Sequence, residues 1–492
     1  MATYSWLTLT AAITALQARL NAGAFWSTAE LQIYLTEALR LRNALCEEWS
    51  DDFVFPASGC QWQNISALAG SPRLRTVTDA YLYTQMQQML LEPPTGAGTW
   101  TGTNQFTLAK MQYALSNRRN EVIQAVACNM VNLPPIVVGI SQRTTNLPDT
   151  TLETRRVRYL ALILTTIGNA TAGGTVIVVA STTGVITGQL VTGPGVAYGS
   201  IITNVVPGAV TISIPTTAAL SAVSVNIYQP MTLTREDTQA FQDFNPGYLQ
   251  ETGIPQSWSV ASQLPLSFDT DVALMLPGEM DVIVLQSGPA FAPPAATLLG
   301  IPDDWSWLPM YGALADLLGE ESESSDKQRA AYCLKRYQDG LAMFKQSNWM
   351  LQANVNGVAC DTPALADKDW FLPEWETVQG QIPCIVQDGI DFVAVAPGAP
   401  SSASLTLVQN APILDATGIF VQVSRDEWEV VLGYAHHAAT FKCGGAEFAE
   451  TIPLIDEFFQ SCARSNKREA TYGLYQDILF AAGKQQDVVE PR

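Results

Sequence analysis

A spaced set of aromatic and small residues occurs twice in this chain, and it constrains the fold more than any single motif. The second set begins at Trp428, 123 positions after Trp305, and an acidic residue, Trp, Tyr and Ala recur in register. Steps of three and four residues place these positions on one face of a helix. A strand-like stretch bounded by proline precedes each set. We therefore predict an α+β module that is used twice.

The modules are expected at residues 251–350 and 381–492, joined by a connector at 351–380. The second module includes a C-terminal helix at about 468–482 and a polar tail. Because Pro309 is tolerated in a first helical turn, the first helix is expected to begin at Ser306 or Trp307. The predicted module cores are Trp305, Leu308, Tyr311, Leu318, Tyr337, Trp428, Val431, Tyr434 and Phe441.

Residues 1–133 have the periodicity of amphipathic helices and predict an N-terminal helical bundle. Thr8 is placed to cap the first helix, and Ser27 with Glu30 forms a capping box for the second. Two further helices are expected at about 78–91 and 106–128, each followed by a pair of prolines.

Between Tyr159 and Thr234 the chain contains no Asp, Glu, Lys, Arg or His. Short Val- and Ile-rich segments alternate there with Gly, Pro and Ser/Thr turns, a pattern typical of a compact β-sandwich or barrel. Strand-like segments with charged residues lie on both sides. We predict a β-sandwich-like domain at 165–228, inserted into a strand-rich region made of 134–164 and 229–250.

The formal charge of the 492-residue chain is −20, and charged residues make up only 15% of it. The negative charge argues against wrapping nucleic acid, since that affinity comes from neutralised phosphates. The low charge content suits a surface that is buried against copies of the chain or against partners. The first residues lack a basic signal-peptide segment and no apolar run has the length of a membrane span, so we expect neither secretion nor membrane insertion.

No residue pattern points to a catalytic, cofactor-binding or metal site. His436 and His437 are the two histidines, and adjacent helical positions diverge too far to share one metal. The eight cysteines form no C-x-x-C pair and are expected to be free thiols. Gly193-Pro194-Gly195 lies between strands and predicts a turn. No G-x-S-x-G occurs, although a triad dispersed along the chain stays open.

Two acidic clusters are expected to be hydrated. Residues 320–326 fall between two helices, where the later ones favour the next helix N-terminus. Glu47, Glu48, Asp51 and Asp52 gather at a helix end, where the dipole disfavours them. Cation binding or a position on the wall of a channel is the alternative for the first cluster.

The helix pairs resemble known phage proteins. Residues 307–318, with Asp326 and 329–337, resemble the C-terminal helical part of tailed-bacteriophage head–tail adaptor proteins. The stretch 433–448 resembles a related phage structural element, and Glu30 to Trp49 is similar to the start of such adaptors. The uncharged 165–228 segment resembles small β-modules of virion proteins. These likenesses touch about half of the chain, and their motifs are packing motifs.

The resemblance implies a non-enzymatic virion protein without cofactors. Its copies would form a ring, of about twelve subunits in this family, that joins the portal protein to the tail nozzle or fibre proteins. DNA would pass through without specific binding, and assembly would take place in the host cytoplasm. The chain is longer than a simple adaptor and its module is doubled, which leaves a tail nozzle, hub or fibre-attachment protein as the alternative.

Two further hypotheses belong to other functional classes. A tail-associated envelope hydrolase would need a carboxylate pair such as Glu320 and Glu323. A carbohydrate- or host-binding module would use residues 165–228.

Overall fold

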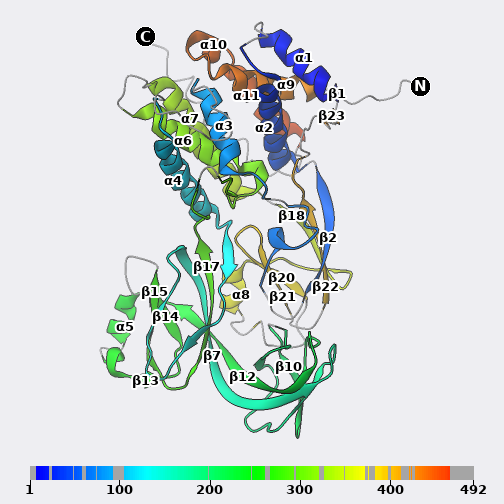
Figure 1. Cartoon of the computed structure of the whole chain (residues 1–492), viewed down its shortest axis with the longest axis vertical. Helices are drawn as coiled ribbons and strands as arrows, with labels where there is room; N and C mark the ends of the chain where they lie inside the picture. The colour runs from blue at the N-terminus through cyan, green and yellow to red at the C-terminus, as the bar shows by residue number, and fades with distance from the viewer. Residues whose placement is uncertain are drawn as a thin grey trace, which may run out of the picture.

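The computed structural model confirms the α+β class and places most helices at one end of an elongated molecule and most strands at the other (Figure 1). The structure describes residues 7–20, 25–47, 49–57, 62–73, 75–91, 105–197, 199–244, 247–260, 266–292, 295–320, 326–347, 349–371, 375, 383–396, 401–411, 420–421, 423 and 427–465. The helix predicted at 468–482 and the tail lie outside these residues. No helix within them is long and apolar enough to cross a membrane.

Four helices come from the N-terminal part of the chain. They are α1 (Leu9–Leu20), α2 (Thr28–Cys46), α3 (Asp79–Met89) and α4 (Leu108–Val126). The predicted caps are present: the Thr8 hydroxyl accepts from the Ala11 amide at 3.1 Å, and the Ser27 hydroxyl accepts from the Glu30 amide at 3.2 Å. Such caps satisfy donors that a helix start otherwise leaves without partners.

The predicted helix pairs follow later in the chain. They are α6 (Trp307–Gly319) with α7 (Lys327–Gln346), and α9 (Trp428–Thr440) with α10 (Gly445–Glu450) and α11 (Ile452–Ser465). Helix α6 packs on α3 and α4, whereas α9 packs on α1 and α2.

The helices of residues 1–133 therefore do not form a bundle of their own, which differs from the sequence prediction. Helix α6 buries eleven of its thirteen residues. A helix that is apolar on nearly all sides must be covered by several neighbours. Helices α3 and α4 supply that cover for α6 together with α7, so one apolar core joins N-terminal and later helices.

The helices fall into two halves, one with α1, α2 and α9 and the other with α3, α4 and α6. Each half also contains a strand pair between segments that are far apart in the sequence. Strand β2 (Ser50–Ala57) follows α2 and pairs antiparallel with β22 (Ser401–Val408). Strand β4 (Met130–Asn132) follows α4 and pairs antiparallel with β17 (Gly278–Gln286). The two halves are thus nested: an outer half uses both ends of the described chain, and an inner half lies between them in sequence.

The inner half is built on two long strands, β7 (Thr151–Ala170) and β12 (Leu220–Arg235). They pair antiparallel from Val157 opposite Leu233 to Ala170 opposite Leu220, so the strand-like segments on both sides of the uncharged stretch are partners. The same region contains β5 (Ile136–Val138), β6 (Thr144–Asn146), α5 (Thr238–Phe244), β13 (Thr252–Gly253), β14 (Ser257–Val260), β15 (Ser267–Thr270) and β16 (Ala273–Leu274).

The far ends of β7 and β12 join β8 (Val176–Val179), β9 (Leu190–Thr192), β10 (Ile202–Val206) and β11 (Ala209–Ile212). Strand pairing runs β10-β11-β8-β7-β12-β9, and a bridge between Leu190 and Ile201 connects the two ends. These strands form a closed barrel around their own apolar core, rather than the two separate sheets of a sandwich. Closure is favourable because it pairs the two edge strands of the sheet, whose backbone N–H and C=O groups would otherwise lack partners.

The outer half adds two small sheets. The first contains β18 (Met350–Val355) and β19 (Val358–Ala359) beside β22 and β2. The second contains β20 (Cys384–Asp388), β21 (Phe392–Ala396) and β3 (Gln63–Asn64). The remaining elements are α8 (Leu365–Phe371), the pair β1 (Leu7–Thr8) and β23 (Phe420–Val421), and the 3-10 turns η1 (Ile65–Ala67), η2 (Tyr248–Gln250) and η3 (Asp303–Trp305).

Candidate functional site

The structure buries eight of the nine predicted module-core residues, each with 3% exposure or less. The ninth, Trp428, is half-buried, and its indole N–H donates to the Val423 carbonyl at 3.0 Å. The two tyrosines of the repeated pattern meet in space, although 123 residues separate them in the sequence. That meeting point is a polar site within the helical core.

Glu37 of α2 is the centre of this helical junction. Its Oε1 atom accepts hydrogen bonds from the Tyr311 hydroxyl at 3.2 Å, the Tyr434 hydroxyl at 2.9 Å and the Arg336 guanidinium at 2.8 Å. The glutamate is 4% exposed. Burial raises the pKa of the Glu37 carboxyl even though Arg336 pulls it down. One carboxylate oxygen therefore connects α2, α6, α7 and α9.

Arg336 of α7 contacts the tyrosine rings of this junction in addition to pairing with the Glu37 carboxylate. Its guanidinium carbon lies 4.1 Å from the ring centroid of Tyr311 and 4.9 Å from that of Tyr434. A guanidinium over an aromatic face gains electrostatic stabilisation, more so when it is desolvated. Burial alone would lower the pKa of Arg336, but the neighbouring tyrosine oxygens and Glu37 raise it, so this arginine carries its charge inside the core.

The network continues to His437 on α9. Arg336 donates to the Tyr332 hydroxyl at 2.9 Å, and that hydroxyl lies 2.7 Å from His437 Nε2. His437 Nδ1 lies 2.8 Å from the Thr451 hydroxyl. Burial, with the Arg336 charge nearby, lowers the pKa of His437 to about 3. Both ring nitrogens of this neutral histidine are thus bonded inside the protein.

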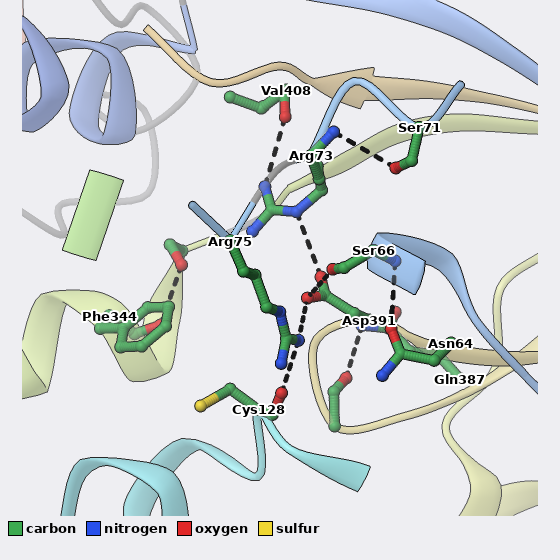
Figure 2. Close-up of polar contacts among 12 residues, drawn as sticks. Asn64, Ser66, Ser71, Arg73, Arg75, Cys128, Phe344, Gln387, Asp391 and Val408 are labelled. Carbon is green, nitrogen blue, oxygen red and sulfur yellow. Dashed lines mark hydrogen bonds and ion pairs between the residues drawn. The ribbon is translucent and has the colours of Figure 1, made fainter. Parts of the chain in front are cut away.

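A second junction surrounds Asp391, in the turn between β20 and β21 (Figure 2). Its carboxylate accepts from Arg73 Nε at 3.1 Å and also binds Arg75 and the Ser66 hydroxyl. Arg75 further donates to the Cys128 carbonyl at 2.6 Å. Burial would raise the pKa of Asp391, but the two arginines and Ser66 lower it. These two ion pairs fix the segment in which the chain passes from the outer half to the inner half.

A third junction involves the acidic pair that precedes α6 of the first module. Asp303 accepts from the backbone amides of Thr76 at 2.7 Å and Val77 at 2.9 Å. Asp304 accepts from the Asn43 side chain at 2.7 Å. Burial raises the pKa of Asp304 to about 6, and its hydrogen bonds oppose that rise. The start of the repeat is therefore bonded to both halves.

The acidic clusters predicted from the sequence are not brought together. Glu320 lies half-exposed in an ion pair with Lys110, and Glu323 lies outside the described residues. Asp52 of β2 accepts from the Thr406 hydroxyl at 2.6 Å, while Glu47 is the C-cap of α2 and Glu48 lies outside the described part. In that part no group of three or more His, Cys, Asp or Glu side chains is placed to bind a metal ion.

A surface cleft of about 530 Å³ lies between strands β7 and β12 of the inner half and the end of β20 of the outer half. Arg155 and Arg235 line it, and both are paired with Glu153. Arg155 also binds Asp388 at 3.2 Å. Since acidic partners already neutralise its arginines, the cleft offers no strong anion site.

No sequence pattern indicates that Glu37 and His437 belong to one network. Their one signal was a polar residue within an apolar helical stripe, and such positions are usually assigned to solvent. Comparison with protein-family models and with curated proteins found no match for this chain.

Proposed function

We propose that this chain is a structural subunit of a tailed-bacteriophage particle, a head–tail adaptor whose copies form a ring around a channel for DNA. The proposal starts from the resemblance of residues 307–318 and 326–337 to such adaptors. One observation carries it further. The tyrosines of both module copies are bonded to one buried carboxylate, so the residues that resemble adaptors join the two halves of a scaffold.

The scarcity of surface charge supports assembly. Charged residues make up 15% of the chain. Among the residues that the structure describes, fifteen of the Asp, Glu, Lys and Arg side chains are buried. These fifteen side chains contribute no charge to the surface. Depletion of charge is a mark of the central part of protein interfaces, which fits a subunit enclosed between neighbours.

The net charge supports a conduit. A ring of copies that each carry a formal charge of −20 repels the phosphates of a passing duplex. Under this proposal the ring contacts the portal protein on one side and nozzle or fibre proteins on the other. It is assembled in the host cytoplasm and retained in the virion.

Native mass spectrometry and negative-stain imaging of the purified full chain test the proposal. We expect a closed ring of about twelve copies with a central opening, and binding of that ring to isolated portal protein. A chain that stays monomeric at every concentration and is absent from purified virions would refute it. A ring that binds a tail protein but no portal would favour the nozzle alternative.

A further inference from the structure

The barrel has an apolar outer face. On β8, Val178 is 55% exposed and Val176 is 49% exposed. The strand register places Val178 beside Ala209 of β11 and beside Asn169 of β7, two residues after the exposed Ile167. Cross-strand partners point to the same face of a sheet. Ile163 and Val206 extend this surface, which we define as the barrel patch: Ile163, Ile167, Val176, Val178 and Val206.

The barrel patch has no charged residue in it or around it. Soluble proteins place charged residues or proline on the edge strands of sheets to prevent association. Strand β2 follows that rule, since it contains Asp51, Asp52 and Pro56. No charged residue occurs between Tyr159 and Thr234, so the barrel has none on any side. An exposed apolar surface of this kind marks an interaction site.

The barrel lies at the end of the molecule opposite α1 and α9 (Figure 1). A contact made there meets no charged side chain of the barrel itself, because residues 159–234 contain none. The Debye length at physiological salt is about 8 Å, so charges beyond that distance contribute little repulsion. The position of the patch and its lack of charge thus both reduce electrostatic repulsion between two copies of the chain.

We propose that the barrel patch binds a second copy of this chain. A neutral contact zone gives no advantage toward a cationic partner, which the formal charge of −20 would attract elsewhere. It gives an advantage toward a partner of the same charge sign, and a second copy is such a partner. The inference rests on the proposed ring and names the contact that closes it. In a ring this contact is heterologous, so the patch meets another part of the neighbouring molecule.

The test introduces one charge into the patch of the full chain. Val178→Glu is compared with Val137→Glu, which changes an equally apolar residue of β5 that is 77% exposed and lies outside the barrel. Sedimentation velocity and native mass spectrometry measure assembly, and near-UV circular dichroism checks that each variant is folded. We expect Val178→Glu to weaken self-association more than tenfold and Val137→Glu to leave it unchanged.

The outcomes separate this inference from the proposed function. Rings that form equally well with Val178→Glu overturn the inference and leave the adaptor proposal standing. A wild-type dimer that Val178→Glu dissociates supports the inference and contradicts the ring. Equal loss of assembly in both variants indicates a general charge effect and overturns the inference.

A lipid surface is the competing occupant. Flotation with zwitterionic phosphatidylcholine vesicles distinguishes it. Vesicle binding that is lost in Val178→Glu, with assembly unchanged, would overturn the proposal.

Discussion

Removing the Glu37 side chain is the sharpest test of the helical junction. Glu37→Ala leaves the Arg336 charge buried without its carboxylate, and two tyrosine hydroxyls lose their acceptor. Breaking a buried ion pair from one side typically costs about 3–5 kcal/mol of the free energy of unfolding. We expect Glu37→Ala to fall in the upper part of that range, since the hydroxyls add about 1 kcal/mol or more.

Urea denaturation followed by tryptophan fluorescence measures this change. Asp316→Ala is the matched control, because Asp316 pairs with Arg118 at 2.6 Å while the two side chains are 39% and 21% exposed. Exposed pairs contribute about 0–1 kcal/mol. Equal losses for Glu37→Ala and Asp316→Ala would refute the view that Glu37 is the centre of the core network.

A double-mutant cycle then measures the interaction free energy between Glu37 and Arg336. Burial raises the pKa of Glu37, so desolvation outweighs the attraction of Arg336. Replacing such a pair by apolar side chains can be nearly neutral. We expect the double variant Glu37→Met with Arg336→Met to lose about 2 kcal/mol less than the two single losses added. Additive losses would show that the two residues act independently.

Three further changes test the packing and the buried titrating groups. Gly340→Ala should destabilise by about 1–2 kcal/mol in urea denaturation despite the better helix propensity of alanine, since a Cβ there would lie 2.4 Å from the Trp307 ring. The pKa of His437 is about 3 in the fold against 6.5 unfolded, so stability falls as pH drops below 6.5, and His437→Gln should remove about 2 kcal/mol of the loss between pH 7 and 5. Asp304 acts in the opposite sense. Its pKa of about 6 exceeds the ordinary 3.8, so its contribution to stability is present at low pH and is lost as pH rises through 6. Asp304→Asn should therefore make the loss of stability on acidification steeper by about 1 kcal/mol. An unchanged pH profile in either variant would contradict its assigned role.

Local signals predicted the helices well. Pro309 placed the start of α6 at Ser306 or Trp307, and the structure has it at Trp307. The caps at Thr8 and Ser27 are also observed, because capping depends on residues within one turn. Glu30, however, does not serve only its own helix: its carboxylate binds Lys442 at 2.9 Å.

The pairing of helices could not be predicted in the same way. Periodicity shows which face of a helix is buried but not what covers it, so it predicts one bundle of α1 to α4. Glu37 and Arg336 are 299 residues apart, and each looked like an ordinary polar position within its own helix. The sequence pattern could not choose between a sandwich and a barrel for a similar reason, since alternation describes a strand but not the neighbour that completes its sheet.

The repeat itself gives a reason for buried charge at the junction. Because α6 and α9 share a pattern, apolar packing alone discriminates weakly between their docking sites on α4 and α2. A cation and an anion fixed at one place penalise any alternative arrangement that separates Glu37 from Arg336. The double methionine variant should therefore retain most of its stability but populate more than one helix arrangement. Amide spectra would then contain duplicated resonances for α6 and α9. A single sharp set of resonances would show that packing alone selects the partner.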